Sequence, residues 1–274
     1  ELREEGLLKQ IGLTNFDAAH LNMVLESGIK VVSNQVSYSL LDQRAKGDMA
    51  AVCEKHGVKI LAFGTLAGGF LTEKWLGKPE PKQEASLTWS QMKYKRFVKL
   101  QELLQVLSKL SEKYHVSMAN VATRYMLEQP AVGGVIVGAR LGESEHVMDN
   151  LRLFDFRLDA DSKKAIENVI AGFSPIPGDC GDEYRKPPFL TASGDLSHHV
   201  EAIPVPYPTT EGSDGRIKAL SGTEWEDLAG FSRAVKKGNR ILISGTTATH
   251  GAKAIGGNDP AAQATFALDK IEGA

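Results

Sequence analysis

Side-chain amides follow two successive apolar stretches of this chain. The first stretch, "QIGL", leads into Thr14 and Asn15, and the second, "IKVVS", leads into Asn34 and Gln35. An amide carries both a hydrogen-bond donor and an acceptor, so two amides together can recognise the carboxamide of a ligand. About one helix separates the stretches, which predicts that both are strands of one parallel sheet. The amides then stand at neighbouring strand ends.

Two later apolar runs also end in residues suited to a ligand. "VKILAF" ends on Phe63 and is followed by Gly64, and "VGGVIV" is followed by Gly138 and Arg140. An aromatic ring stacks on a flat ring, and a glycine-rich turn before a helix holds a phosphate. Amides, aromatic ring and glycine turns together suit a nicotinamide dinucleotide at the carboxyl ends of the strands.

The amides also have a purely structural explanation. Asn15 would cap the helix that follows it, and Gln35 would bond a loop carbonyl. Composition alone favours this explanation, because buried polar groups are usually satisfied within the protein. The combination of residues at four strand ends favours the dinucleotide site.

Strand and helix patterns alternate through the first half of the chain. The expected strands are 10–13, 29–36, 58–63 and 132–139, and the expected helices are 17–27, 44–56, 93–115, 117–129 and 143–151. Gly28 and Gly57 are expected to end helices, and Ser117 to cap one. This alternation predicts an α/β fold with parallel strands covered by helices on both faces.

Composition excludes several classes of protein. The chain has 274 residues, 42% of them hydrophobic and 24% charged, with a net charge of -2. This balance gives no basis for binding nucleic acid or an anionic membrane. Apolar runs are too short for a membrane span, and no signal peptide is expected at the start. Cys53 and Cys180 stand alone in the sequence, so we expect a reducing, cytoplasmic setting.

Five motifs in order resemble the second half of an aldo-keto reductase. They are "IGLTNF", "VVSNQVSYSLLD", "ILAFGTLAGGFLTEKW", "VATRYMLEQPAVGGVIVGAR" and "EHVMDNL". The resemblance implies a partial (β/α)8 TIM barrel, its second half of four βα units, over residues 1–172. Members of this family reduce aldehydes and ketones with NAD(P)H.

The resemblance also assigns residues to the cofactor. Thr14, Asn15 and Gln35 would bind the nicotinamide carboxamide, and Phe63 would stack on the ring. Gly64 and Leu66 would line the path of the pyrophosphate. The adenosine end would be held by Gly138, Arg140, His146, Asp149 and Asn150. Arg140 and His146 are candidates for a 2'-phosphate contact, which favours NADP over NAD.

The catalytic residues of the family lie on the first four barrel strands, which have no counterpart here. We therefore expect no catalytic residue in this chain. A closed barrel needs eight strand–helix units, and only four are found. Tyr38 or Lys59 would have to substitute, but nothing pairs Tyr38 with a lysine, and an unassisted tyrosine is a poor acid near neutral pH.

Residues 173–215 change in character. They hold most of the prolines and little periodicity, which is typical of a linker. His198 and His199 are adjacent and have no cysteine or carboxylate cluster beside them, so we expect a solvated pair and no metal site.

The last segment resembles the start of a Rid domain, the YjgF-type fold that hydrolyses enamines and imines. "GFSRAVKKGNRILISGTTAT" and "DPAAQATFALDKIEGA" carry the likeness, giving a partial α+β domain over 216–274. Asp259 is expected to cap a helix that starts at Pro260, with Ala264, Leu268 and Ile271 facing a sheet. The resemblance places Phe231 and Ser232 at the site, whereas the arginine that binds substrate would lie after Ala274.

Three functional hypotheses follow. The first is a truncated two-module protein whose parent reduces small-molecule carbonyl compounds with NADP. The second is a nucleotide-binding or interaction module without turnover, which the missing tyrosine and lysine favour for this chain alone. The third is an incomplete imine deaminase. Unpaired sheet edges predict an oligomeric or aggregation-prone chain.

Overall fold

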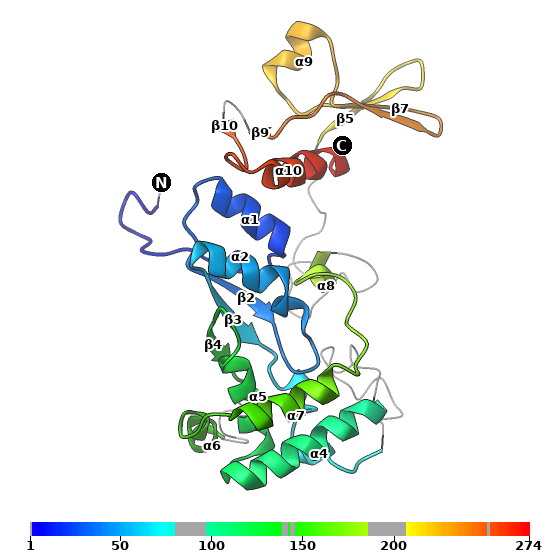
Figure 1. The fold of residues 1–274 in the computed structure, drawn as a ribbon. Coiled ribbons are helices and arrows are strands. Elements are labelled where there is room, and N and C mark those ends of the chain that lie inside the picture. Colours follow the sequence, from blue (N-terminus) through cyan, green and yellow to red (C-terminus); the bar gives the residue numbers. More distant parts are fainter. Residues whose placement is uncertain (1, 80–96, 139–141, 143–145, 186–206, 251–252) are drawn as a thin grey trace. The chain divides into compact units, whose positions relative to one another are not determined.

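A computed structural model provides the structure of the chain. It describes residues 2–79, 97–138, 142, 146–185, 207–250 and 253–274. The chain forms two compact units (Figure 1). Unit 1 contains residues 1–18 and 30–193, and unit 2 contains residues 19–29 and 194–274.

A four-stranded parallel sheet forms the centre of unit 1. Its strands are β1 (Gly12–Thr14), β2 (Ser33–Ser37), β3 (Lys59–Phe63) and β4 (Val132–Ile136), in the order β1-β2-β3-β4. Every neighbouring pair runs parallel. The prediction of parallel strands is confirmed, and all four carboxyl ends therefore lie along one edge of the sheet.

The two faces of this sheet differ in burial. Four residues on one face are 0% exposed, namely Asn34, Val36, Ile60 and Ala62. Side chains alternate along a strand, so Gln35, Leu61 and Phe63 lie on the opposite face, where they are half-buried. Ile136 pairs with Phe63 and is 42% exposed. The described part of the chain thus covers one face and leaves the other partly open.

Four longer helices belong to unit 1. They are α2 (Asp48–His56), α4 (Phe97–Tyr114), α5 (Met118–Leu127) and α7 (Ala160–Ile170). Gly57 ends α2 with a left-handed backbone, φ 69°, as predicted. The hydroxyl of Ser117 caps α5 as predicted, accepting the N–H of Asn120 at 3.2 Å. Asp159 caps α7 in the same way, although the sequence interpretation omitted this helix.

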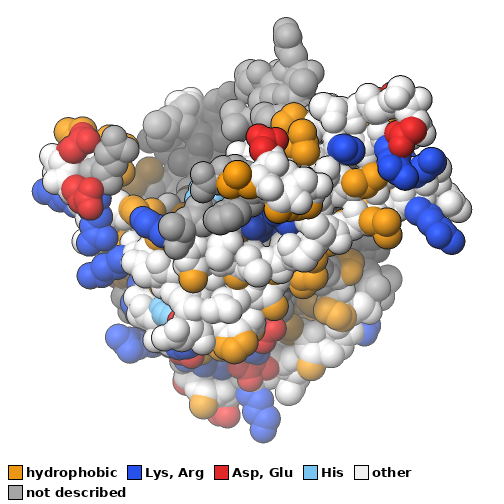
Figure 2. All heavy atoms as spheres, turned by 90° about the horizontal axis from the view of Figure 1, so that it is seen from above, with side chains coloured by type: hydrophobic (Ala, Val, Ile, Leu, Met, Phe, Trp, Pro, Cys, Tyr) orange, Lys and Arg blue, Asp and Glu red, His pale blue; other side chains and the backbone are white. Residues whose placement is uncertain are grey.

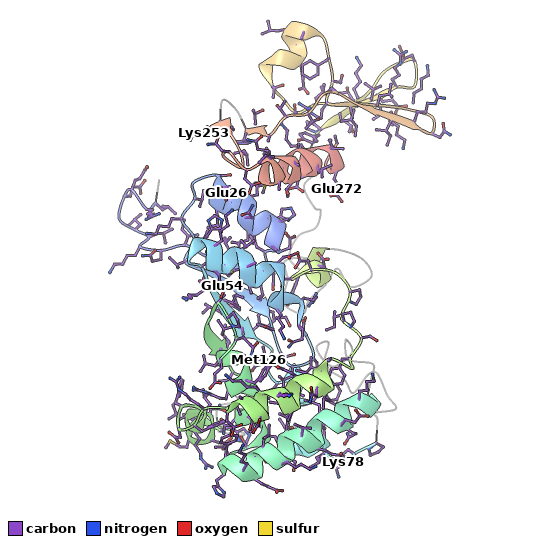
Figure 3. The ribbon with its side chains drawn as sticks, viewed as in Figure 1. Glu26, Glu54, Lys78, Met126, Lys253 and Glu272 are labelled. Atoms are coloured by element: carbon purple, nitrogen blue, oxygen red, sulfur yellow. The ribbon has the colours of Figure 1, made fainter. Side chains whose placement is uncertain are left out.

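The apolar core beside the sheet is built from α4, α5 and α7. Its fully buried side chains include Leu103, Leu104, Leu107, Val121, Tyr125, Met126 and Ile166. Met126, labelled in Figure 3, lies on α5. Burial of one such side chain stabilises the fold by about 1.5–3 kcal/mol.

Short helical segments complete unit 1. They are η1 (Arg44–Lys46), η2 (Ala67–Gly69), η3 (Glu73–Trp75), α6 (Val147–Leu151), η5 (Arg152–Phe154) and α8 (Asp182–Arg185). The helix expected over 44–56 is therefore divided, because the backbone of Gly47 leaves the helical region at ψ −113°. Helix α8 falls inside the range expected to be a linker.

Unit 2 contains a second, antiparallel sheet. Its strands are β5 (Thr209–Glu211), β6 (Ile217–Ala219), β7 (Ala234–Lys237) and β8 (Arg240–Ile243), in sequence order. The other elements are α1 (Ala18–Glu26), α9 (Glu224–Ala229), β9 (Thr249–His250), β10 (Lys253–Ala254) and α10 (Pro260–Glu272). Strand β5 also lies within the range 173–215, so that range is not uniformly irregular.

Helices α1 and α10 are joined by polar contacts within unit 2. The ring of His20 lies 3.0 Å from a carboxylate oxygen of Asp269. The amide of Asn22 donates to Asp259 at 3.1 Å. The other carboxylate oxygen of Asp259 accepts the N–H of Ala261 at 2.8 Å, which confirms the predicted helix cap.

Apolar side chains remain exposed in unit 2. Leu268 and Ile271 of α10 are 62% and 36% exposed, and Ala264 is exposed as well, so the expectation that these three residues face a sheet is wrong. On β8, the last strand of the sheet, Ile241 and Leu242 are 58% and 72% exposed. Figure 2 shows hydrophobic side chains interspersed with Lys and Arg on the face seen from above.

No helix of the described chain is both long enough and apolar enough to cross a membrane. Over the same residues, His, Cys, Asp and Glu nowhere gather in a group of three that could hold a metal ion. His198 and His199 lie outside the described residues.

Candidate functional site

The carboxyl ends of β1 and β2 bring the first group of predicted site residues together. Thr14 is the register partner of Gln35. The N–H of Asn15 donates to the backbone carbonyl of Gln35 at 2.8 Å. Main-chain pairing therefore fixes these three residues side by side at one edge of the sheet.

Gln35 and Phe63 share the partly open face of the sheet. Ser37, two residues after Gln35, pairs with Phe63, so the two side chains are diagonal neighbours on adjacent strands. Both are half-buried. The side-chain amide of Gln35 makes no hydrogen bond with any described residue, and a ligand amide on this face would meet a donor and an acceptor there.

The sequence predicts Asn15 and Asn34 as amides at neighbouring strand ends, but Asn34 does not face the open side of the sheet. Asn34 lies on the covered face, is 0% exposed, and donates to the carbonyl of Phe16 at 2.9 Å. Asn15, directly before Phe16, has a left-handed backbone with φ 56°. Asn34 is thus a brace for the turn after β1 rather than a group at the site. The alternation of side chains along a strand predicts this difference, because the neighbours Asn34 and Gln35 must face opposite sides of the sheet.

A tight turn follows Phe63. Gly64, Ala67, Gly68 and Gly69 all have positive φ, between 51° and 93°. The N–H of Ala67 donates to the carbonyl of Gly64 at 2.8 Å, and Ala67 is fully buried. Glycine at three of these positions allows the turn, because side chains rarely tolerate this backbone conformation. Leu66 is half-buried in the same turn.

The predicted adenosine end is only partly described. Gly138 is exposed two residues after β4, and His146 is exposed at the start of α6. Asn150 is half-buried within α6. Arg140 lies outside the described residues.

Asp149 has structural partners. Its carboxylate accepts the hydroxyl of Ser117 at 2.8 Å, and its backbone carbonyl accepts the amide of Asn120 at 2.9 Å. These contacts join α6 to the start of α5. They are sufficient to explain an acidic residue at this position without a ligand.

Tyr38 is poorly placed for acid catalysis. It is 1% exposed. Burial raises its pKa far above the usual value, and nearby Tyr125, Cys180 and Asp42 raise the pKa further. Its N–H bonds the carbonyl of Phe63 at the carboxyl edge of the sheet.

Lys59 stands at the other end of the same sheet. It begins β3, where it pairs with Ser33, and its side chain is exposed. Tyr38 and Lys59 therefore lie at opposite ends of the strands, and they form no tyrosine–lysine pair of the kind that carbonyl reduction needs.

Comparison with known proteins identifies the family of the chain. The family model described as "Aldo/keto reductase family" matches residues 1–171. The chain is 29% identical over 171 residues to aldo-keto reductase family 1 member C1 of Pongo abelii, covering 61% of this chain and 45% of that protein. It is 26% identical over 165 residues to the NADH-specific methylglyoxal reductase of Escherichia coli (strain K12), covering 59% and 49%. The chain spans about half the length of the curated relatives it matches.

A solved structure shows the same fold. The glycerol dehydrogenase of Gluconobacter oxydans superposes with a TM-score of 0.54 at 24% sequence identity, over 65% of this chain and 54% of that one. This likeness supports an α/β fold of the aldo-keto reductase type, which is TIM-barrel-like. With the family match over more than half of its length, the chain belongs to the aldo/keto reductase family.

Proposed function

We propose that residues 1–172 are the cofactor-binding second half of an aldo-keto reductase barrel. The whole protein would reduce a small carbonyl compound with NADP(H). The observation that carries the proposal is the meeting of Thr14, Asn15, Gln35 and Phe63 at one sheet edge. Ligands of parallel α/β folds bind at this edge.

The nicotinamide would bind at the open face. The side-chain amide of Gln35 has both a donor and an acceptor for the carboxamide, and Thr14 and Asn15 stand beside it. Phe63 would stack on the ring. The turn from Gly64 to Gly69 brings backbone close to the sheet edge, where Gly64 and Leu66 would line the pyrophosphate path.

The adenosine end would lie near Gly138 and α6. Arg140 and His146 would contact a 2'-phosphate, which is the basis for NADP rather than NAD. Asp149 and Asn150 would contact the adenosine, with Asp149 held in place by Ser117.

This chain alone would bind the cofactor without turning it over. The general acid, its lysine and its aspartate would come from the first half of the barrel. A non-catalytic nucleotide-binding module is therefore the second candidate for the isolated chain. The observation that favours it is the separation of Tyr38 from Lys59.

The remaining chain would form two further parts, a linker over 173–215 and a partial Rid domain over 216–274. Support for the Rid-type domain comes from the antiparallel hairpin β7–β8 and from α10 with its Asp259 cap. Phe231 and Ser232, both half-buried just before β7, would face its site. Imine hydrolysis would need an arginine from beyond Ala274.

A fluorescence titration with NADPH and with NADH tests the cofactor assignment. Arg140→Ala should weaken NADPH more than NADH, because only NADPH offers a 2'-phosphate. Arg157→Ala, which removes an exposed arginine of unit 1, is the matched control and should change neither affinity. Equal losses for both cofactors with Arg140→Ala would remove the phosphate role. A wild-type chain that binds neither cofactor would reject the proposed function.

A further inference from the structure

Arg233, in unit 2, is a buried cation with an unusual environment. Arg233 directly precedes β7 and is 7% exposed. One terminal nitrogen, Nη1, donates to the hydroxyl of Thr246 at 3.2 Å and lies 3.4 Å from the hydroxyl of Ser244 and from the carbonyl of Gly245. Its Nε is buried and has no hydrogen-bond partner among the described residues.

The other buried arginines of the described chain are neutralised by carboxylates. Arg44 makes a two-bond contact with Asp42, at 2.8 Å and 2.7 Å. Arg124 contacts Glu128 at 2.6 Å. Arg233 has no acidic partner among the described residues. Burial of an unneutralised charge is unfavourable, and proteins usually compensate it with an opposite charge.

Lys270 approaches the same segment from α10. Its ammonium donates to the carbonyls of Thr247 and Thr249 at 3.2 Å and 3.0 Å. Burial lowers the pKa of Lys270, and the positive charge of Arg233 lowers it further. Two cations therefore converge on residues 244–249, and the repulsion between them contributes to the lowered pKa of Lys270.

Only one terminal nitrogen of the guanidinium, Nη1, is held by neighbouring described residues. Ser244 and Thr246 hold Nη1, and their own protons go to the backbone carbonyls of Arg233 and Ser244. The edge formed by Nε and the second terminal nitrogen makes no hydrogen bond with a described residue. This edge presents two parallel N–H groups, the arrangement that matches two oxygens of a carboxylate or a phosphate.

We propose that Arg233 and Lys270 form a binding site for a small oxyanion, a carboxylate or phosphate group. Arg233 would supply the paired N–H donors, and Lys270 the second charge. Ser244 and Thr246 would position the guanidinium without contacting the ligand. The site lies in unit 2 and does not depend on the nicotinamide site of unit 1.

Isothermal titration of the full chain tests this site. Sodium phosphate and sodium propionate are titrated separately, with ionic strength held constant by sodium chloride. The wild-type chain should bind one equivalent of at least one anion, and preference between the two identifies the group. Arg233→Gln and Lys270→Gln should each weaken binding by about tenfold or more, because bonds to charged groups are the stronger class. The control variant Arg240→Gln, which replaces an exposed arginine of β8, should bind the anion as the wild-type chain does.

A second measurement separates the site from a purely structural role of Arg233. Titration of Lys270 by NMR should show its pKa rise when the anion is bound, since a negative charge offsets the repulsion from Arg233. Lys270→Gln removes a half-buried side chain, so it stays informative if Arg233→Gln fails to fold. Absence of saturable binding by both anions, or an equal loss in Arg240→Gln, would overturn the proposal.

Discussion

The side-chain amide of Asn34 donates a hydrogen bond to the backbone carbonyl of Phe16, with a nitrogen–oxygen distance of 2.9 Å. The bond joins the first half of β2 to the turn after β1, from the covered face of the sheet. It holds the chain beside Asn15, whose left-handed backbone lies at the proposed cofactor edge. A fully buried amide on the covered face thus supports the turn beside the proposed cofactor edge.

Asn34→Ala should destabilise the fold and weaken NADPH binding together. The substitution leaves the Phe16 carbonyl without its partner, which costs about 1–3 kcal/mol of unfolding free energy. Urea denaturation measures the first effect and NADPH titration the second. Asn22→Ala, which removes a half-buried amide of unit 2 that donates to Asp259, is the control and should leave NADPH affinity unchanged. If the Asn34→Ala chain is destabilised but binds NADPH as tightly as wild type, the bond from Asn34 to Phe16 does not position the cofactor site.

The isolated chain should not reduce aromatic aldehydes with NADPH above background. Tyr38 is buried and its raised pKa disfavours the ionised form, and no lysine of the described chain contributes to its pKa. Loss of general acid catalysis alone lowers a rate on the order of a hundredfold or more. A spectrophotometric assay of NADPH consumption measures this. Turnover that Tyr38→Phe abolishes would mean that Tyr38 is a catalytic residue.

The chain should self-associate or aggregate in solution. Strands β1 and β4 are sheet edges, and the face bearing Leu61, Phe63 and Ile136 is only partly covered by described residues. Unpaired edges and open apolar faces favour association. Sedimentation across a range of concentrations measures it. A monodisperse monomer with a cooperative melt would count against a half-barrel.

Acid should weaken the contact between α5 and α7 through Glu128. Burial alone would raise the pKa of Glu128, but hydrogen bonds from Lys163 and Arg124 outweigh it and the pKa is lowered. A lowered pKa means that its stabilising contribution is present above the unfolded value, about 4.3, and is lost as pH falls through the folded value. Urea titrations should show wild type more stable than Glu128→Gln at pH 7, with a smaller difference at pH 3. If the stability difference between wild type and Glu128→Gln does not change with pH, the ion pairs of Glu128 are not its source.

The sequence was sufficient for the order of the elements and for several of their ends. The strand–helix alternation predicted four parallel strands, and Gly57, Ser117 and Asp259 marked helix ends because their roles are local. The prediction failed where tertiary context decides. A run of helix-forming residues hid the break at Gly47, and the apolar spacing of Leu268 does not determine that a sheet will cover it.

For the site, the sequence identified the residues at the strand ends but not their directions. Gln35 and Asn34 are adjacent amides, and only the register of β2 assigns one to the open face and the other to the core. The engagement of Asp149 with Ser117 joins residues far apart in the chain, which no local pattern encodes. The convergence of Arg233 and Lys270 is invisible in the sequence for the same reason.

The affinity of the Gln35→Ala chain for NADPH tests whether Gln35 binds the nicotinamide carboxamide, because Gln35 is the amide that faces the open side of the sheet. Fluorescence titration should show a loss of about 1–3 kcal/mol relative to wild type, the cost of unpaired polar groups in the complex. Gln129→Ala, an amide that bonds the carbonyl of Tyr125 at the end of α5, should bind NADPH as wild type does. Equal affinities for wild type and Gln35→Ala would show that Gln35 does not bind the cofactor and would return the strand-end amides to a structural role.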